Sequence, residues 1–208
     1  RSVSRGLGDV YKRQIWGNPS GRISETVRFD TERPVAGLPE TVTFQPGERA
    51  KVIDGLSIAG ECDLVIRVLS ADGGVLTTSN LCRISDAYAY GQYWSDLHGQ
   101  SEETVGTNAA RDYFAFARDL GFLDIAGHQG NDSQITDAFW AELNGLTAEF
   151  DEPGRFVCVP GFEWSGNTNL GGDHNVWYRQ EGRPIFRSSR VLIDDTDSPG
   201  TDAHTLPE

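Results

Sequence analysis

Four side chains that could ligate a metal ion are spread over the second half of the sequence. His98 and His128 each end an apolar segment that is expected to be a strand, and Glu163 follows the apolar run VCVPGF. His174 opens a further segment of this kind. Neutral imidazole and carboxylate groups are donors that suit Zn²⁺, Mn²⁺ or Fe²⁺. A carboxylate at the end of an apolar strand is costly unless a cation or a hydrogen-bond donor meets it. We therefore predict a divalent-metal site built from these residues.

Four more polar side chains lie close in sequence to these candidates and could bind the metal or orient its ligands. They are Gln100, Glu103, Asp132 and Asp173. We expect Asp132 or Asp173 to fix the tautomer of His128 or His174, with a solvated aspartate in a turn as the alternative. The fourth histidine, His204, is expected to lie outside the site.

One basic cluster stands out in this acidic chain, the stretch YRQEGRPIFRSSR at residues 178–190. Guanidinium groups suit phosphate or carboxylate ligands, so Arg183 and Arg187 are candidate substrate contacts. Pairing with surplus surface acids is the alternative. Trp164 and Trp177 could stack on a sugar or a base, with packing in the core as the alternative.

The second half of the chain alternates strand-like and helix-like segments. Residues 107–122 predict a helix that begins at Thr107, stops at Gly121 and buries one face. That face comprises Ala109, Tyr113, Phe116 and Leu120. Residues 135–146 predict a second helix, with Thr136 as its cap and with Phe139, Leu143 and Leu146 directed inward. This alternation favours a parallel sheet or an α/β barrel, in which sites form at the carboxyl ends of strands.

The region before residue 88 has a different pattern. Apolar residues alternate along 62–84 around a turn at Asp72-Gly73, which indicates antiparallel strands. Leu64, Ile66 and Val68 are expected to share one buried face. We therefore predict a small β domain at 15–88 and a second domain at 89–208.

Composition excludes several kinds of partner. The chain has 208 residues and a formal net charge of −13, so it offers no basic stripe for nucleic acid or for an anionic membrane surface. No segment approaches the roughly 20 apolar residues of a membrane span. Cys62 and Cys82 could form a disulfide between neighbouring strands of an exported protein, or they and Cys158 could be free thiols. The composition tilts the expected location slightly towards the periplasm or secretion.

The first residues are expected not to belong to the natural protein. The stretch DVYKRQ at 9–14 resembles the translation of a transposase end used in preparing sequencing libraries. We exclude residues 1–14 from the prediction of the fold for this reason. The chain is accordingly expected to be a fragment with arbitrary ends.

The stretches DLHGQ, LDIAGHQGND, PGFEW and GGDHNVWY resemble the successive metal-binding motifs of the PHP (polymerase and histidinol phosphatase) superfamily. They are similar in particular to a bacterial PHP-like family of undefined function, over about residues 92–195. This resemblance implies a partial, distorted (β/α)7 barrel, here preceded by a small antiparallel β-sandwich-like domain. It also implies two or more divalent ions and hydrolysis of phosphoesters, including saccharide phosphoesters, by a metal-activated water. The implied ligands are His98, His128, Glu163 and His174, with no separate catalytic residue.

The sequence departs from the superfamily pattern at three places. Gln100 stands where the family has a second histidine. Val105 stands where many members have an acid, so Glu102 or Glu103 would have to replace it. The late Asp-x-His motif is missing, which a truncated barrel would explain.

Two other functions are compatible with the same residues. Glu163 and Asp132 could be the paired carboxylates of a metal-free glycoside hydrolase. Alternatively, the chain could be a non-catalytic scaffold that binds a carbohydrate or a protein.

Overall fold

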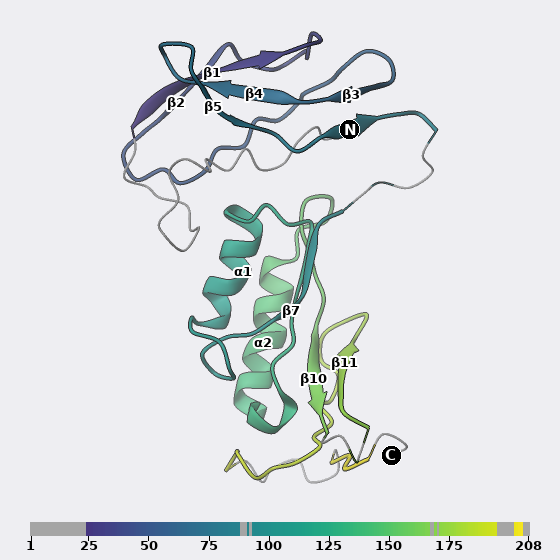
Figure 1. Ribbon diagram of the computed structural model, residues 1–208. Helices are drawn as coiled ribbons and strands as arrows, with labels where there is room; N and C mark the ends of the chain where they lie inside the picture. Colours follow the sequence, from purple (N-terminus) through teal and green to yellow (C-terminus); the bar gives the residue numbers. More distant parts are fainter. Residues whose placement is uncertain are drawn as a thin grey trace. The chain divides into compact units, whose positions relative to one another are not determined.

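The computed structural model describes residues 24–87, 91, 93–166, 169, 171–194 and 202–205. The chain divides into two compact units, residues 1–91 and 92–208 (Figure 1). The segment 1–14, which we expect to be foreign to the protein, lies outside the described residues.

The first unit consists of antiparallel strands. Its larger sheet has the order β2-β1-β4-β5, and its smaller sheet pairs β3 with β6. The bounds are β1 Glu25–Thr31, β2 Thr41–Phe44, β3 Cys62–Leu64, β4 Ile66–Leu69, β5 Val75–Thr78 and β6 Cys82–Ile84. The hairpin β4-β5 turns at Gly73, whose φ of +90° is a conformation that suits glycine.

The core of the first unit lies between its two sheets. Leu64 and Ile66 are 2% and 1% exposed and come from β3 and β4, one from each sheet. Val68 is buried as well, so the predicted burial of Leu64, Ile66 and Val68 is confirmed, although Leu64 belongs to a different sheet from the other two. Burial of apolar side chains from both sheets, away from water, thus stabilises this unit.

The three cysteines are free thiols. Cys62 pairs in register with Ile84, and Cys82 with Leu64, so the two thiols lie diagonally across the β3-β6 pair rather than opposite each other. Of the two alternatives, the structure therefore has free thiols. Burial raises the pKa of the Cys158 thiol to about 12, which keeps it protonated.

The second unit contains a parallel sheet with the order β7-β8-β9. The bounds are β7 Ser95–Gly99, β8 Ile125–His128 and β9 Val157–Cys158. After β9 the chain continues as β10 (Gly161–Ser165), which pairs with β11 (Asp173–Trp177) as an antiparallel hairpin. The Glu163 amide donates to the Gly130 carbonyl at 2.9 Å, so β10 runs beside the extension of β8.

The prediction of a partial, distorted (β/α)7 barrel is wrong. Only β7, β8 and β9 form a parallel sheet within the described residues, and the chain then reverses through the hairpin β10-β11. The connection 166–172 is shorter than the dozen or more residues that a parallel crossover needs. Gly171 and Gly172 have φ values of +122° and +82°, which allow the chain to turn back there.

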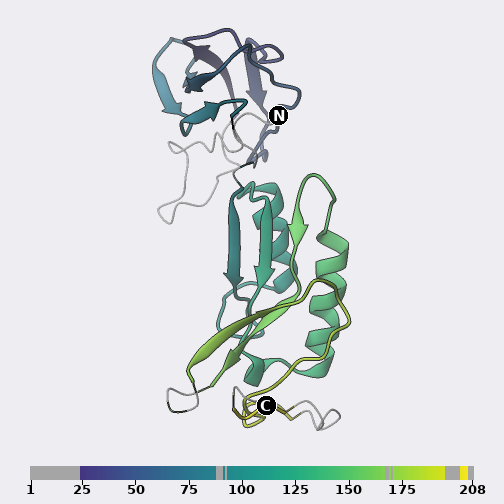
Figure 2. The same ribbon diagram turned by 90° about the vertical axis from the view of Figure 1, so that its right-hand side faces the viewer.

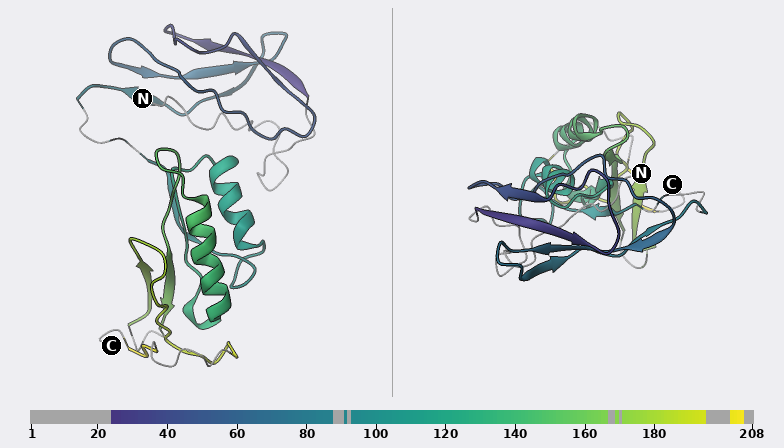
Figure 3. Two further views of the ribbon diagram at one scale, coloured as in Figure 1. Left: turned by 180° about the vertical axis from the view of Figure 1, so that it is seen from behind. Right: turned by 90° about the horizontal axis from the view of Figure 1, so that it is seen from above.

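Two helices cover one face of this sheet (Figures 2 and 3). They are α1 (Ala110–Asp119), which connects β7 to β8, and α2 (Asp137–Phe150), which connects β8 to β9 after the short 3-10 helix η2 (Asp132–Gln134). Neither α1 nor α2, the helices in the described part of the chain, has the length and apolarity of a membrane-spanning helix.

The first helix starts later than predicted. Its N-cap is Ala109, which makes no capping bond with its side chain, whereas the sequence predicted Thr107. The Asn108 carbonyl instead accepts from the Glu102 amide at 2.8 Å, which keeps residue 108 in the preceding loop. The helix ends where it was predicted to end, with Leu120 as C-cap and Gly121 directly after it, although the positive φ belongs to Phe122 (+52°).

The predicted inner face of this helix is also wrong. The buried residues are Ala110, Phe114 and Ala117, while Phe116 is 44% exposed. The buried stripe thus lies one residue further along the chain than predicted. Tyr113 lies at the border of this stripe and packs partly against the core.

The second helix begins at its predicted cap and buries the predicted face, but it ends at Phe150, four residues later than predicted. The Thr136 side chain accepts from the Phe139 amide at 3.1 Å, which is an N-cap bond. The predicted inward residues Phe139, Leu143 and Leu146 are 7%, 3% and 4% exposed. These side chains join Phe162 in the main core of the second unit.

Candidate functional site

The strands of the second unit direct alternate residues to opposite faces of the sheet. Phe162 and Trp164 of β10 lie in the core with the helices, so Glu163 between them points to the other face. A side chain at Gly99 would overlap the Tyr113 ring of α1, so position 99 faces the helices. His98 therefore points away from them. We call the side opposite α1 and α2 the outer face.

His98 and Glu163 meet on the outer face. His98 Nε2 lies 2.5 Å from Glu163 Oε2, although the two residues are far apart in the sequence. The Glu163 side chain is 8% exposed, whereas that of His98 is 59% exposed. The pair therefore combines a buried, fixed carboxylate with an imidazole that solvent can reach.

Asn131 supports this pair, and the sequence analysis missed it. Its Nδ2 donates to Glu163 Oε1 at 3.1 Å and to Ser165 Oγ at 2.8 Å. Asn131 also forms a parallel bridge with Glu163, which places the two residues side by side. The only signal in the sequence was an amide three residues after His128.

His128 lies on the opposite, helix-covered face. It is 3% exposed, and its ring packs edge-on against Phe139 at 5.8 Å between centroids. The Gly130 amide donates to Nδ1 at 3.1 Å, so the neutral ring carries its proton on Nε2, which lies 2.8 Å from Ser101 Oγ. Burial lowers the pKa of His128 to about 4. Both ring nitrogens are thus engaged, and His128 does not join His98 and Glu163.

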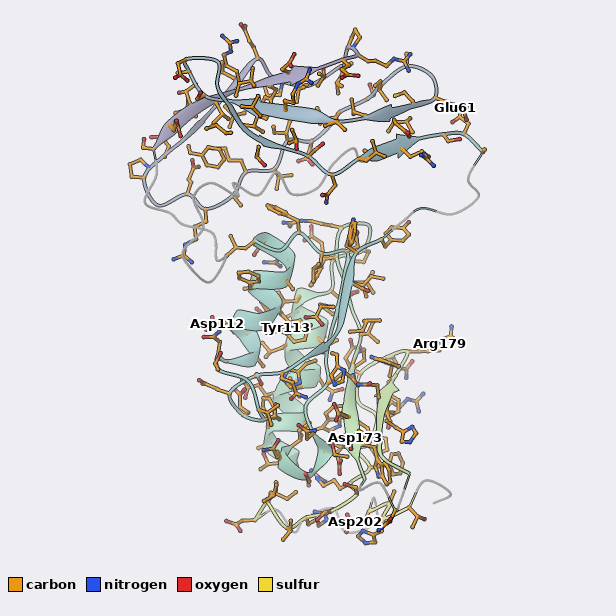
Figure 4. The ribbon with its side chains drawn as sticks, viewed as in Figure 1. Glu61, Asp112, Tyr113, Asp173, Arg179 and Asp202 are labelled. Atoms are coloured by element: carbon orange, nitrogen blue, oxygen red, sulfur yellow. The ribbon has the colours of Figure 1, made fainter. Side chains whose placement is uncertain are left out.

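His174 does not join them either. On the hairpin it pairs in register with Trp164, whereas Glu163 pairs with Asn175. Paired residues share a face, so His174 and Glu163 point to opposite faces of the hairpin. Its Nε2 lies 3.0 Å from the Gly171 carbonyl oxygen. Asp173, the predicted partner of a histidine, is exposed on β11 (Figure 4).

Asp132 is a structural carboxylate rather than a partner of His128. It is 0% exposed and accepts from the Ser165 amide at 2.5 Å, from the Ser188 amide, and from Ser188 Oγ at 2.9 Å. Burial raises the pKa of Asp132, against the opposing effect of these hydrogen bonds. The residue fastens the segment around Ser188 to the end of β10.

Gln100 and Glu103 lie in the loop after β7. Gln100 Nε2 donates to the Gln129 carbonyl at 2.7 Å, and its Oε1 accepts from Thr104 Oγ1 at 2.6 Å. These bonds hold the loop against the next strand, so Gln100 does not take the role of a ligand. Glu103 raises the pKa of His128 slightly against the larger effect of burial, and its Oε2 is buried without a hydrogen-bond partner among the described residues.

The predicted substrate contacts separate into buried and exposed residues. Arg187 is 0% exposed and pairs with Asp137 at 2.6 Å, so it is part of the interior. Trp164 is 4% exposed, and its Nε1 donates to the Ala203 carbonyl at 2.7 Å. Neither can touch a substrate in this structure. Arg183 is exposed and remains accessible to a ligand.

His204 was expected to lie outside the site. Its Nδ1 lies 3.0 Å from the Ser188 carbonyl oxygen.

The described residues contain no group of three or more His, Cys, Asp and Glu side chains placed to hold one metal ion. The predicted four-residue ligand set is therefore reduced to His98 and Glu163, the two of its members that meet. Imidazole and carboxylate are suitable donors for Zn²⁺, Mn²⁺ or Fe²⁺.

Comparisons with known proteins do not assign the chain to a family. No family model matches it. Over 91 residues, 42% of this chain, it is 28% identical to an uncharacterized protein of Chlamydia pneumoniae, and the match spans 14% of the length of that protein. No solved structure matches the chain. The resemblance to the PHP superfamily stays a prediction.

Proposed function

We propose that this chain is part of a metal-dependent hydrolase in which His98 and Glu163 bind the metal. One contact supports this proposal, the 2.5 Å approach of His98 Nε2 to Glu163 Oε2 on the outer face. A buried carboxylate such as Glu163 needs a cation or a hydrogen-bond donor beside it, and His98 occupies that place here. Its position beside the carboxyl end of β7 is where α/β proteins commonly bind ligands.

The surrounding residues prepare Glu163 for this role. Asn131 holds one of its oxygens, so the other stays directed at His98. Such support of a ligand from behind typically accounts for 10–100-fold in metal affinity. The exposed ring of His98 leaves the approach open to a substrate.

A divalent ion held by these two groups would supply Lewis acidity and lower the pKa of water at the site. The substrate class, a phosphoester, is proposed from the resemblance to the PHP superfamily. The metal-free glycoside hydrolase that would use Glu163 and Asp132 is less well supported, because Asp132 is buried and its oxygens already accept hydrogen bonds.

The test is metal binding by the full chain. We expect the protein, stripped with EDTA and titrated with Mn²⁺, to bind the ion, and Glu163→Gln and His98→Ala each to weaken binding about tenfold or more. His174→Ala is the matched control, because this histidine lies on the same hairpin but points to the opposite face. Hydrolysis of p-nitrophenyl phosphate with Mn²⁺ is expected to fall in parallel. Unchanged Mn²⁺ affinity in both variants, or an equal loss in His174→Ala, would refute the proposed site.

A further inference from the structure

The outer side of β11 presents a row of side chains beside the His98–Glu163 pair. Asp173, Asn175 and Trp177 alternate along this strand, so all three point to the outer face. They offer a carboxylate, an amide and an indole in sequence. Figure 4 shows Asp173 on the hairpin of β10 and β11.

Trp177 lies over two glycines. A methyl group added at Gly161 would come within 3.3 Å of Trp177 Cδ1, and one added at Gly127 within 3.8 Å of its Nε1. The indole therefore lies close to the backbone at both glycines, next to the side chains of Gln129 and Leu97, and Trp177 is still 46% exposed. Large exposed aromatic rings of this kind provide apolar contact area with little loss of conformational entropy.

The amide next to Trp177 is oriented by a buried partner. Asn175 Nδ2 donates to Gln129 Oε1 at 2.9 Å, and Gln129 is 0% exposed. Since the nitrogen of Asn175 is engaged, its carbonyl oxygen is the atom that can accept from a ligand hydroxyl. Asn175 stands directly opposite Glu163 across the hairpin.

We propose that Trp177 and Asn175 bind the ring of a saccharide, with the indole against its apolar C–H face and the amide of Asn175 on its hydroxyls. The segments 161–165 and 173–177 contain no Lys or Arg, and they place Glu163 and Asp173 on this face. That charge disfavours a polyanion such as nucleic acid and suits a neutral polyhydroxylated ring.

This inference deepens the proposed function and rests on it for the position of the phosphoester. Trp177 is the diagonal neighbour of Glu163 on the hairpin, which puts their backbones roughly 7–8 Å apart. A saccharide ring on Trp177 would therefore place a phosphate substituent at the His98–Glu163 pair. The saccharide phosphoester is the substrate class that this arrangement selects.

The test uses neutral sugars and the metal-free full chain, so that it does not depend on hydrolysis. Methyl glycosides of glucose, galactose, mannose, xylose and N-acetylglucosamine are added in EDTA, and binding is followed by saturation-transfer NMR and tryptophan fluorescence. We expect at least one glycoside to bind, with transfer strongest to the protons of one ring face. Trp177→Ala is expected to weaken binding about tenfold and Trp177→Phe less.

Trp94→Ala is the matched control, because Trp94 is 65% exposed and precedes β7 at the end away from His98. It is expected to bind like the unmodified chain. The saccharide site is refuted if no glycoside binds, if Trp177→Ala binds as well as the unmodified chain, or if Trp94→Ala loses as much. Mn²⁺ binding measured on Trp177→Ala is expected to be unchanged. If the unmodified chain binds a glycoside but does not bind Mn²⁺, the proposed hydrolase is overturned and the saccharide site is not.

Discussion

The two faces of the sheet in the second unit use alternate residues of the same strands for different purposes. On the helix-covered face His128 is buried between aromatic rings, and both of its nitrogens have partners within the protein. On the outer face His98 is exposed and meets a single carboxylate. Whether a histidine at the end of a strand is available to a ligand therefore depends on the face of the sheet to which its side chain points.

The largest loss of stability is expected from substitutions in the core on the helix-covered face. Phe114→Ala should lower the free energy of unfolding by about 3–5 kcal/mol, because Phe114 is 0% exposed and its removal leaves a cavity. Phe116→Ala, in the same helix but 44% exposed, should cost less than about 1 kcal/mol. Urea denaturation of both variants measures the difference. Equal losses would show that α1 buries another face.

A pH effect of similar size is expected from His128. Its pKa is about 4 in the folded chain against an ordinary value of 6.5, so protonation favours the unfolded state. Its contribution is complete above pH 6.5 and is lost as the pH falls towards 4, by about 3 kcal/mol. The measurement is unfolding free energy against pH for the unmodified chain and for His128→Gln, which should lack this component.

Phe139→Leu provides the control for this pH effect. It loosens the packing around the same imidazole but leaves the titrating group in place. Its stability should be lower at every pH and should still fall between pH 6.5 and 4, unlike that of His128→Gln. A profile of His128→Gln parallel to that of the unmodified chain would contradict the buried, neutral state of this ring.

The smallest losses of stability are expected from substitutions on the outer face. Asn175→Ala removes the partner of the buried Gln129 amide and should cost about 1 kcal/mol. Asp173→Ala, at the next outward position of β11, is exposed and should change stability by less than about 0.5 kcal/mol. Thermal unfolding of the two variants side by side checks this. A loss at position 173 as large as that at 175 would mean that the outer face is packed more tightly than described.

Local signals in the sequence predicted the second helix and part of the site. Thr136 was recognisable as a cap because its side chain can accept from the first turn, and α2 begins there. The meeting of His98 with Glu163 followed from placing both at the ends of strands. These inferences depended on neighbouring residues or on one shared edge of a sheet.

The remaining predictions failed where the direction of the chain decided the outcome. The barrel required each strand to be followed by a crossover, but the connection before β11 is short and rich in glycine. Reversal of the chain at that point put Asn175 rather than His174 opposite Glu163. A shift of one residue in the pairing of a strand moves every side chain to the other face of the sheet. The spacing of residues in the sequence therefore could not show to which face His174 points.

Because Gly99 has no side chain, the position of the His98–Glu163 pair depends on Tyr113 of α1. The Tyr113 ring fills the place of the missing side chain, and its hydroxyl reaches the carbonyls of Asp96 and Gly127 at 3.1 and 3.3 Å. One phenol thereby clamps β7 to β8 from behind. Any bulk added at position 99 would displace this clamp and shift β7, and His98 would move away from its carboxylate although its own side chain had not been changed.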